Sequence, residues 1–598
     1  MALLLYKKFI IFTYKPKIVK TNFLAIALAS SVVCVAQSKQ QPNVVIIITD
    51  DQGYGDLSFT GNPHLKTPFI DKFAKESVRM NNFYVCPVSS PTRSGLMTGR
   101  YSLRTGIRDT YNGGAMMAAN EITVAEMLKD AGYTTGIFGK WHLGDNYPFR
   151  PNDQGFDESV NHLDGGMGQP GDITTYFKGD SSYFDPVLWH NGKQEGYSGY
   201  CTDIFADQAI KFIEKNHTSP FFCYLAFNAV HEPLQVPDKY YSLFKDIDPA
   251  SGFGNDKRPF YKMSEIDKEA ARRVYAMVTN LDENIGKVLK KLDDLKISEN
   301  TLVIFMSDNG PYRTRYLAGM RGQKGSVYRG GIRVPCFIRY PGLIKGNIEV
   351  ETNTAYIDIM PTIAEICHAE LPKDRIIDGK NLLPLIKGEN VDWKNRSLFF
   401  YWTRRYPELY NNIALQKGSY KLVGHTNYNE GINGFELFDV FKDPYEQSNI
   451  IKDYRDIAKN LKIDLDIILK DLVNSPNLVN QPRIIIGNEH ENPVFLNRTD
   501  AYGERGWAEE EFYGKWRLSI SEGLYNIKFR FLKPVKANGR MILETGTFIN
   551  QMLNVKQEAE EIEMKDIYFS DMECDFIPYY SVDSRRISPL WIKIEKQN

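Results

Sequence analysis

The stretch Asn43–Asp56 has the sequence NVVIIITDDQGYGD, an unbroken apolar and β-branched run that stops at two aspartates. A continuous run of this kind is typical of a strand that is buried on both faces, as in a parallel sheet. Helices must then cover both faces of that sheet. The stretch therefore predicts an α/β fold with a helix-covered sheet.

Three later stretches also consist of an apolar run that is followed directly by polar residues. TTGIFGKWHLG ends in Lys140 and His142, PFFCYLAFNAVHEP ends in His231, and NTLVIFMSDNGP ends in Asp308 and Asn309. In open α/β sheets the ligand crevice lies outside the carboxyl ends of the strands. We therefore expect these side chains to meet at one edge of the sheet and to form the site.

Helical periodicity separates these predicted strands. A one-sided apolar stripe with helical spacing runs from Val278 to Leu295 and predicts a core-packing helix. CTDIFADQAIKFIEK predicts another crossover helix. Later segments predict short strands with a helix ending near Val473, and then alternating strands in which Tyr525 and Phe531 share a face. The predicted division is a signal peptide at 1–36, a catalytic α/β domain at 41–388, a small α+β subdomain at 389–475 and a β-sandwich-like accessory domain at 483–598.

The N-terminus has the features of a secretory signal. Five lysines precede the apolar run FLAIALASSVVCVA, which is too short to span a membrane comfortably and ends in small residues. We predict cleavage near Ala36–Gln37 and export to the periplasm or the extracellular space, with no transmembrane segment in the mature chain. A membrane anchor is the alternative. Lipid attachment at Cys34 is disfavoured because bulky Val32 and Val33 precede it.

Charge and cysteine content exclude some functions. The formal net charge of −1 argues against a general nucleic-acid binder. Loss of the five signal lysines makes the mature chain more negative, so an anionic substrate would need a local basic site. The six remaining cysteines are scattered without a C-x-x-C pair, so no zinc or redox motif is indicated. A disulfide is possible in an exported protein, but spacing assigns none.

The acidic residues at two of the strand ends suggest a metal site. Asp50, Asp51, Asp308 and Asn309 are all oxygen donors, and hard oxygen ligands select Ca²⁺ or Mg²⁺ over zinc. A single aspartate at a strand end is more often a helix N-cap. Two adjacent pairs at two strand ends make that alternative much weaker.

The stretch Tyr84–Arg100, YVCPVSSPTRSGLMTGR, holds the candidate nucleophile. Here the chain resembles the formylglycine-dependent sulfatases of the arylsulfatase type, which have an alkaline phosphatase-like fold. Their signature is Cys or Ser, any residue, Pro, any residue, Arg, then a small-residue turn and Thr-Gly-Arg or Thr-Gly-Lys. Ser89 fits this signature with Pro91, Arg93 and the closing Thr-Gly-Arg. Cys86 does not fit, because valine and serine stand where proline and arginine are required.

The resemblance implies a mechanism and a set of residue roles. A serine-type maturase would act transiently on Ser89 and oxidise it to formylglycine. One hydroxyl of the aldehyde hydrate attacks sulfur, and the other loses its proton as sulfate is expelled, so no water needs to attack sulfur. The matching positions are Asp50, Asp51, Asp308, Asn309 and the modified Ser89 as ligands of one Ca²⁺, Arg93 at the hydrate, Lys140 and Lys324 at the sulfate, His142 as base and His231 as the acid for the leaving alcohol.

The resemblance covers about residues 41–449, with one local departure. Arg329 stands where relatives often carry an acidic residue, which suggests an altered pocket rim. Aromatic and basic residues are expected at that rim and suit sulfated sugars. They are Tyr312, Arg313, Arg315, Tyr316, Trp402, Arg404 and Arg405. We therefore expect a carbohydrate sulfatase that acts on sulfated glycan fragments.

Two other functions remain open from the sequence. A phosphoesterase of the same fold usually needs two zinc ions, and the nine histidines form no D-x-x-x-H or H-x-x-H cluster for a second ion. A non-catalytic protein that binds sulfated glycans is the other alternative, if Ser89 is never oxidised. The complete acid, base and lysine set argues against a decayed site.

Overall fold

The computed structural model describes residues 41–254, 256–393, 395–404, 406–425, 431–504 and 506–597. The predicted signal peptide lies outside these residues. In the described part of the chain, no helix has the length and apolar character needed to cross a bilayer. From Gln41 onward the chain forms one compact unit. The predicted division of this unit into three domains therefore stays a prediction.

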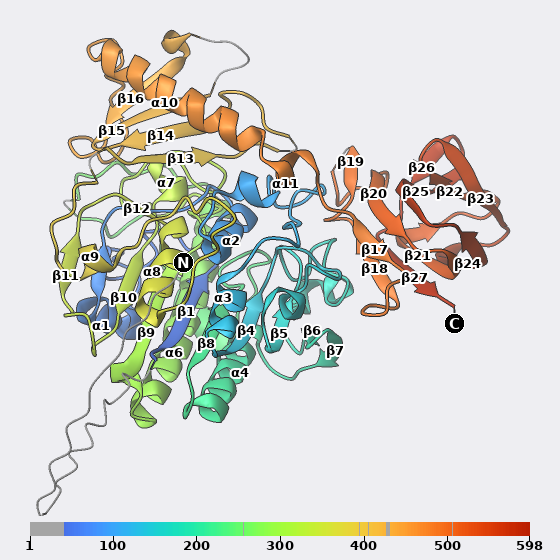
Figure 1. The fold of residues 1–598 in the computed structure, drawn as a ribbon, viewed down its shortest axis with the longest axis horizontal. Coiled ribbons are helices and arrows are strands. Elements are labelled where there is room, and N and C mark those ends of the chain that lie inside the picture. Colours follow the sequence, from blue (N-terminus) through green and yellow to red (C-terminus); the bar gives the residue numbers. More distant parts are fainter. Residues whose placement is uncertain are drawn as a thin grey trace, which may run out of the picture. The chain divides into compact units, whose positions relative to one another are not determined.

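A ten-stranded sheet forms the centre of the structure, with the order β11-β2-β10-β9-β1-β8-β4-β5-β6-β7 (Figure 1). β1 (Asn43–Thr49) lies between β9 (Thr301–Ser307) and β8 (Phe221–Ala226) and runs parallel to both. β4 (Thr134–Lys140) lies parallel to β8, and β5 (Glu158–His162) lies parallel to β4. The four predicted strands are thus neighbours, and their carboxyl ends meet at one edge of the sheet.

The outer strands make the sheet mixed. On one side β10 is antiparallel to both β9 and β2, and β11 is parallel to β2. On the other side β6 and β7 continue antiparallel from β5. These strands are β2 (Val78–Met80), β10 (Cys336–Arg339), β11 (Ile348–Val350), β6 (Val187–His190) and β7 (Lys193–Gly196).

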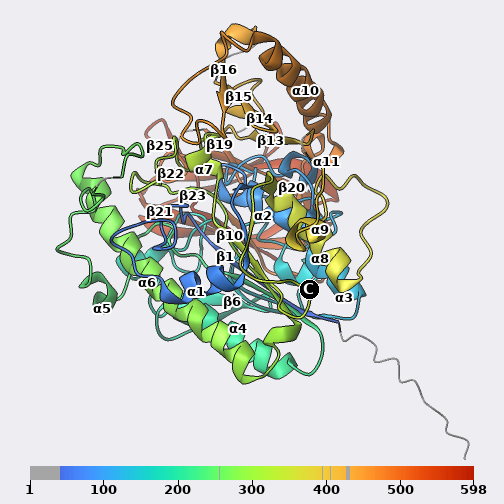
Figure 2. The same cartoon turned by 90° about the vertical axis from the view of Figure 1, so that its left-hand side faces the viewer.

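Helices cover both faces of the sheet (Figures 1 and 2). Val45 and Ile47 of β1 belong to the core under α1, α4 and α6, whereas Val44 and Ile46 belong to the core under α2, α3 and α8. β1 is therefore buried on both faces, as its sequence predicted. The helices are α1 (Pro68–Glu76), α4 (Cys201–Asn216), α6 (Glu265–Asp294), α2 (Ser89–Thr98), α3 (Val124–Asp130) and α8 (Ile359–Cys367).

A second, antiparallel sheet follows the catalytic region and has the order β13-β14-β15-β16. α10 (Arg455–Val473) packs on it through leucines three or four positions apart, including Leu461, Leu465, Leu469 and Leu472. The strands are β13 (Ser397–Tyr401), β14 (Ile413–Lys417), β15 (Tyr420–Gly424) and β16 (Phe435–Asp439). β13, β15, β16 and α10 match the strands and the helix that the sequence predicted here, whereas β14 was not predicted.

The C-terminal part consists of two sheets that share one apolar core. The predicted alternation of Tyr525 and Phe531 is confirmed: both are buried, while Leu524 beside the turn is exposed. The first sheet contains β17 (Ile484–Ile486), β19 (Tyr502–Glu504), β20 (Tyr513–Ile520), β22 (Gly539–Thr545), β23 (Phe548–Val555), β25 (Met572–Val582) and β26 (Arg585–Ile587); the second contains β18 (Val494–Asn497), β21 (Gly523–Val535), β24 (Ala559–Phe569) and β27 (Trp591–Lys596).

Shorter elements complete the described chain. They are α5 (Asp238–Tyr241), α7 (Arg329–Ile332), α9 (Leu383–Ile386), α11 (Pro476–Val479), β3 (Phe83–Tyr84) and β12 (Thr354–Ala355). The six cysteines of the described residues are all free, so none of them forms a disulfide there.

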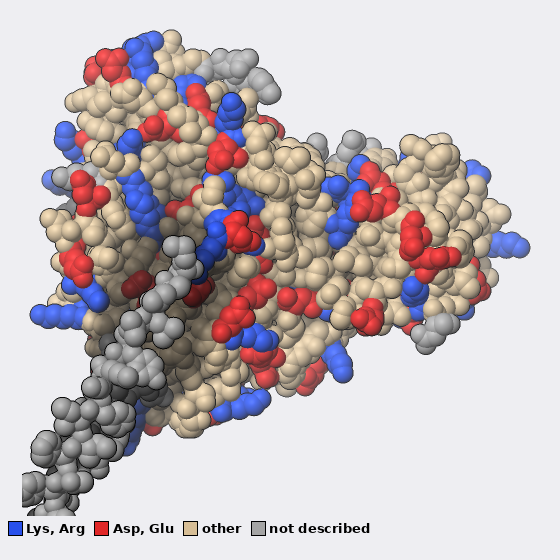
Figure 3. Space-filling model, viewed as in Figure 1, with Lys and Arg blue, Asp and Glu red and all other residues tan. Residues whose placement is uncertain are grey.

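Surface charge is mixed on the face shown in Figure 3, where acidic and basic side chains are interspersed. This face carries no broad basic stripe of the kind that tracks a nucleic-acid backbone. Any attraction of this face for an anion must therefore be local.

Candidate active site

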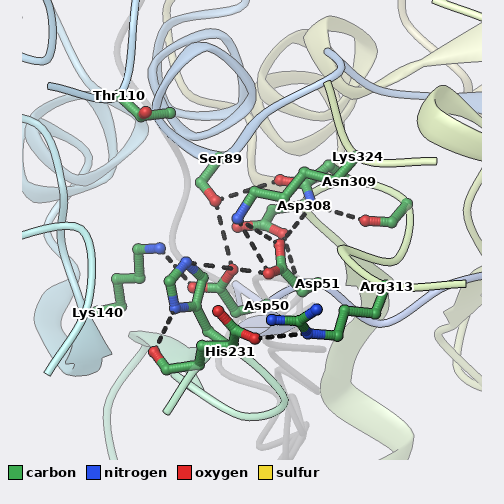
Figure 4. Close-up of polar contacts among 12 residues, drawn as sticks. Asp50, Asp51, Ser89, Thr110, Lys140, His231, Asp308, Asn309, Arg313 and Lys324 are labelled. Carbon is green, nitrogen blue, oxygen red and sulfur yellow. Dashed lines mark hydrogen bonds and ion pairs between the residues drawn. The ribbon is translucent and has the colours of Figure 1, made fainter. Parts of the chain in front are cut away.

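Four oxygen-bearing side chains come together where β1 and β9 end (Figure 4). Asp50 and Asp51 follow β1, and Asp308 and Asn309 follow the neighbouring parallel strand β9. The Asp51 backbone N–H donates to Asp308 Oδ1 at 3.2 Å, and Asn309 Nδ2 donates to Asp51 Oδ1 at 2.7 Å. Parallel neighbours end at the same sheet edge, so residues some 260 positions apart share one cluster.

Ser89 is the first residue of α2, and its hydroxyl points into this cluster (Figure 4). Ser89 Oγ lies 3.3 Å from Asp50 Oδ1 and 3.2 Å from Asn309 Oδ1. The sequence led us to expect a small-residue turn after Arg93, but the stretch is a buried helix. Pro91 is tolerated because the N–H groups of a first helical turn need no partner within the helix. Gly95 is required because a Cβ there would lie 2.2 Å from the Tyr356 ring.

Arg93 and Lys140 neutralise two of the carboxylates. Arg93, one turn beyond Ser89, donates to Asp308 Oδ2 from Nη2 at 2.8 Å and from Nε at 3.1 Å. Its Nη2 also lies 3.5 Å from Asp50 Oδ2. Lys140, the last residue of β4, forms an ion pair with Asp50. Figure 4 shows Lys140 on the opposite side of the cluster from Lys324.

Lys324 is the third cation of the cluster and pairs with the remaining aspartate. Its Nζ lies 2.7 Å from Asp51 Oδ1 and 3.0 Å from Asp51 Oδ2. Burial alone would raise the pKa of Asp51, but the charge of Lys324 lowers it. For Asp50, burial is likewise outweighed, chiefly by Lys140, and the pKa is lowered. The paired aspartates are therefore held ionised, which is the form that binds a cation.

His231 lies in the loop after β8, with one ring nitrogen turned toward the cluster. Nδ1 lies 2.7 Å from the Glu232 carbonyl and donates to it, which leaves Nε2 as the nitrogen 3.9 Å from Asp51 Oδ2. Burial is the main cause that lowers the pKa of His231, and Lys324 adds to it. One oxygen each of Asp50 and Asp51 and one His231 nitrogen lie within 4.8 Å of one another. A cation could therefore be held here.

His142 follows β4, and its ring nitrogens form no hydrogen bond with Ser89. Its Nε2 lies 2.8 Å from the Thr110 carbonyl and donates to it. Its Nδ1 is buried and has no hydrogen-bond partner among the described residues. Burial and the charge of Lys140 hold the pKa of His142 well below its usual range. The ring is thus a neutral imidazole with a free acceptor. Sequence reasoning missed Thr110, because no motif marks it.

The structure brings nine of the ten predicted site residues into one network of contacts of 4 Å or less, with His142 outside it. Ser89, Asp50 and Asn309 form its centre, with the three cations and His231 around them (Figure 4). Cys86 stays apart: its Sγ lies 3.0 Å from the Tyr356 hydroxyl, and burial raises its pKa to about 12. A thiol with so high a pKa is a poor nucleophile at neutral pH.

Two of the predicted rim residues, Arg315 and Tyr316, are buried, so their assignment to the pocket rim was wrong, and Arg329 is buried as well. Arg315 is 3% exposed and pairs with Asp56 at 2.6 Å, and Tyr316 is 3% exposed. Arg329 is 2% exposed, and its guanidinium donates to the Val440 carbonyl at 3.0 Å. These interior partners lie far away in the sequence, so the local sequence gave no sign of them.

Other predicted rim residues do reach the surface. Tyr312 and Arg313 are partly exposed, and Arg313 Nε lies 2.9 Å from Glu232 Oε1. The Arg404 side chain is half exposed, with its guanidinium 4.8 Å from the Trp402 ring centre. Arg405 lies outside the described residues.

Comparisons with known proteins show the family of the chain. A family model described as Sulfatase matches residues 42–369, and one described as N-sulphoglucosamine sulphohydrolase, C-terminal, matches residues 322–471. The chain is 32% identical over 440 residues to an arylsulfatase of Hemicentrotus pulcherrimus, covering 67% of this chain and 72% of that protein. It is 31% identical over 408 residues to an N-acetylgalactosamine-6-sulfatase of Mus musculus, covering 63% and 72% respectively.

A solved structure shows the same likeness. The crystal structure of Ps i-CgsB in complex with k-i-k-neocarrahexaose matches with a TM-score of 0.62 and 29% identity, over 73% of this chain and 94% of that chain. The fold and the site therefore define a hydrolase with an alkaline phosphatase-like fold. The chain belongs to the sulfatase family, and it is a sulfuric ester hydrolase.

Proposed function

We propose that this sulfatase is exported and removes sulfate from sulfated glycan fragments, using a formylglycine made from Ser89 and one Ca²⁺. The observation that carries the proposal is the position of Ser89. Its hydroxyl lies at the start of α2, against Asp50 and Asn309, in a cluster that also holds the buried cations Arg93 and Lys140 and the partly buried Lys324. A serine with a purely structural role is not expected among so many charged side chains, so this environment favours a catalytic role for Ser89.

The residues present fit a calcium ion. Asp50, Asp51, Asp308, Asn309 and the oxygen of Ser89 offer only oxygen donors, which Ca²⁺ prefers. They would hold the ion at the end of β1 and β9. When bound, the ion would supply positive charge that orients the nucleophile and the sulfate oxygens.

Formylglycine at position 89 would supply a geminal diol in place of a single hydroxyl. His142 is suited to take a proton from that diol, because Nε2 is committed to the Thr110 carbonyl while Nδ1 is a free acceptor. A low pKa keeps this ring neutral. Loss of that proton would expel sulfate by elimination. Arg93, held by Asp308, would stabilise the diol from the second turn of α2.

His231 is suited to donate a proton to the leaving alcohol. Its Nδ1–H is committed to the Glu232 carbonyl, so a second proton would reside on Nε2, which is turned toward the cluster. The aspartates favour that charged form, although burial opposes it more strongly. Lys140 and Lys324 would neutralise the sulfate oxygens, since both are held in the cluster by aspartates.

The relatives support a carbohydrate substrate. One of them is named an N-acetylgalactosamine-6-sulfatase, and a structural neighbour was solved with a neocarrahexaose. Trp402 lies against Gly325, the residue after Lys324, since a Cβ on Gly325 would lie 3.0 Å from the Trp402 ring. Trp402 and the neighbouring Arg404 therefore add an aromatic and basic surface next to Lys324. Aromatic faces suit sugar rings, and guanidinium groups suit further sulfates.

The test combines mass spectrometry with activity. The peptide that contains Ser89 should lack two hydrogen atoms relative to unmodified serine when the enzyme is made with a serine-type maturase. Ser89→Ala should abolish turnover, whereas Cys86→Ser should remain nearly as active as the wild type. An active Ser89→Ala enzyme would disprove the nucleophile. Hydrolysis of an aryl sulfate, with none of a panel of sulfated galactose, N-acetylgalactosamine, N-acetylglucosamine and fucose saccharides, would disprove the glycan assignment.

A further inference from the structure

A groove of about 640 Å³ lies where the C-terminal β region meets a loop of the catalytic region. Its walls include Arg108 from that loop, Tyr406 from the segment after β13, and Tyr502, Lys515 and Arg586 from the C-terminal strands. We call it the basic tyrosine groove. No acidic side chain of the described residues lines it.

The chemistry of the groove suits a sulfated sugar. The Arg108 guanidinium lies 4.5 Å from the Tyr406 ring centre and 5.3 Å from that of Tyr502. The Arg586 guanidinium lies 4.6 Å from the Tyr579 ring and forms no ion pair with a described residue. Tyrosine faces can stack on sugar rings, and a guanidinium fork matches the oxygens of a sulfate or carboxylate.

Nearby carboxylates neutralise only part of the positive charge of the groove. Lys515 Nζ lies 2.6 Å from Asp575 Oδ2, so that lysine is already paired. Glu544 accepts a hydrogen bond from the Tyr579 hydroxyl at 2.7 Å and is not one of the groove residues. Arg586 is thus the exposed cation in the groove that is best placed to meet an anion.

Hydrogen bonds hold the two walls of the groove together. The Gly113 N–H donates to the Thr499 carbonyl at 2.9 Å, and the Gly503 N–H donates to Asn112 Oδ1 at 2.7 Å. The Tyr111 and Trp507 rings also stack, with centres 5.2 Å apart. The groove is therefore a built feature of the fold, in which each side supplies part of the lining.

The same loop connects the groove to the active site. Arg108 lies two residues before Thr110, whose carbonyl accepts the hydrogen bond from His142. Between them, Asp109 Oδ1 accepts from Trp402 Nε1 at 3.2 Å and from Arg404 Nη1 at 3.0 Å. Basic and aromatic side chains thus continue from the vicinity of Lys324 to the groove.

We propose that the basic tyrosine groove binds an anionic stretch of the sulfated glycan, beyond the sugar whose sulfate ester is hydrolysed. The inference rests on the proposed function for the class of ligand. It gives the C-terminal β region a role in substrate binding and makes the enzyme favour oligosaccharides over monosaccharides.

The test uses Arg586→Glu in the full chain, with Arg540→Glu as the matched control. Arg540 is an exposed arginine on β22 of the same β region and does not line the groove. Affinities are measured by calorimetry in a Ser89→Ala background. The probes are sulfated hexasaccharides of the galactose, N-acetylgalactosamine and glucosamine types and their sulfated monosaccharides. Thermal unfolding checks that both variants are folded.

We expect the Ser89→Ala protein with an intact groove to bind one hexasaccharide at least about tenfold more tightly than its monosaccharide. Arg586→Glu should remove most of this difference, and Arg540→Glu should retain it. Equal affinities for hexasaccharides and monosaccharides, or an unchanged preference for the hexasaccharide in Arg586→Glu, would overturn the proposal that the groove binds the glycan. A sulfatase that hydrolyses only aryl sulfates would instead overturn the proposed function, which the separate activity panel detects.

Discussion

Replacement of Asp308 by alanine should affect both stability and metal binding. Asp308 is fully buried, and its Oδ2 accepts two hydrogen bonds from the equally buried Arg93. Its Oδ1 accepts from the Asp51 backbone N–H at 3.2 Å. Alanine would leave the Arg93 charge and this N–H without their main partner and would remove one proposed calcium ligand.

The expected loss of stability follows from this geometry. Removing one partner of a buried ion pair costs roughly 3–5 kcal/mol in the free energy of unfolding. Asp50 Oδ2 lies 3.5 Å from Arg93 Nη2 and can take over part of the interaction. We therefore expect the lower end, about 3 kcal/mol. If the predicted catalytic domain at 41–388, about 350 residues, unfolds as one cooperative unit, this lowers Tm by about 4 °C.

The assays are thermal unfolding, metal content by mass spectrometry and kcat/KM on the best substrate. Asp358→Ala is the matched control, because Asp358 is another fully buried aspartate paired with an arginine, Arg396. The control should lose similar stability but keep its metal, whereas Asp308→Ala should lose metal and activity as well. Full calcium content and activity in Asp308→Ala would refute the ligand assignment. An unchanged Tm would refute the reasoning about the buried pair.

Three further predictions concern the base, the metal and a buried acidic cluster. Burial and the charge of Lys140 keep the pKa of His142 well below 6.5, so in the pH profile of kcat the loss of activity on the acidic side should be centred below pH 6.5. His142→Ala should lower kcat by about 10²–10⁴-fold. A wild-type acidic limb centred above pH 6.5 would contradict the assignment of His142 as the base. Chelation should abolish activity and Ca²⁺ should restore it, whereas stoichiometric zinc in active enzyme would contradict an oxygen-ligand site. Burial raises the pKa of Asp164 and Asp500 to about 7, above the range of an unfolded aspartate, so the folded state binds more protons between pH 4 and 7. The free energy of unfolding should therefore fall by an amount on the order of a few kcal/mol as pH rises through this window, and it should be flat below the window. If a variant with Asn at both positions follows the same pH profile as the wild type, these two groups do not cause the change.

The sequence by itself determined the fold class, and through a family resemblance it predicted the position of the proposed nucleophile. Residues Val44–Ile48 are all apolar, β-branched and buried, and a short run of this kind is typical of a strand packed on both faces. Parallel neighbours share a carboxyl edge, so the chemistry of Asp50 and Asp308 could be placed together without coordinates. The resemblance to the sulfatase signature placed the proposed nucleophile at Ser89, because Pro91 and Arg93 stand at the offsets that this signature requires.

Only the tertiary structure decided which way the irregular segments turn their side chains. Arg315 in a loop and Arg329 at the start of the short helix α7 are basic residues, for which solvent exposure is the usual outcome, yet each has buried partners distant in the sequence. The tautomer of His142 depends on the carbonyl of Thr110, in a loop that no motif marks. The basic tyrosine groove likewise exists only because the C-terminal strands dock on that loop. The local sequence pattern indicates periodicity and burial in helices and strands. The partner of a loop side chain is instead set by contacts that form only when the whole chain has folded.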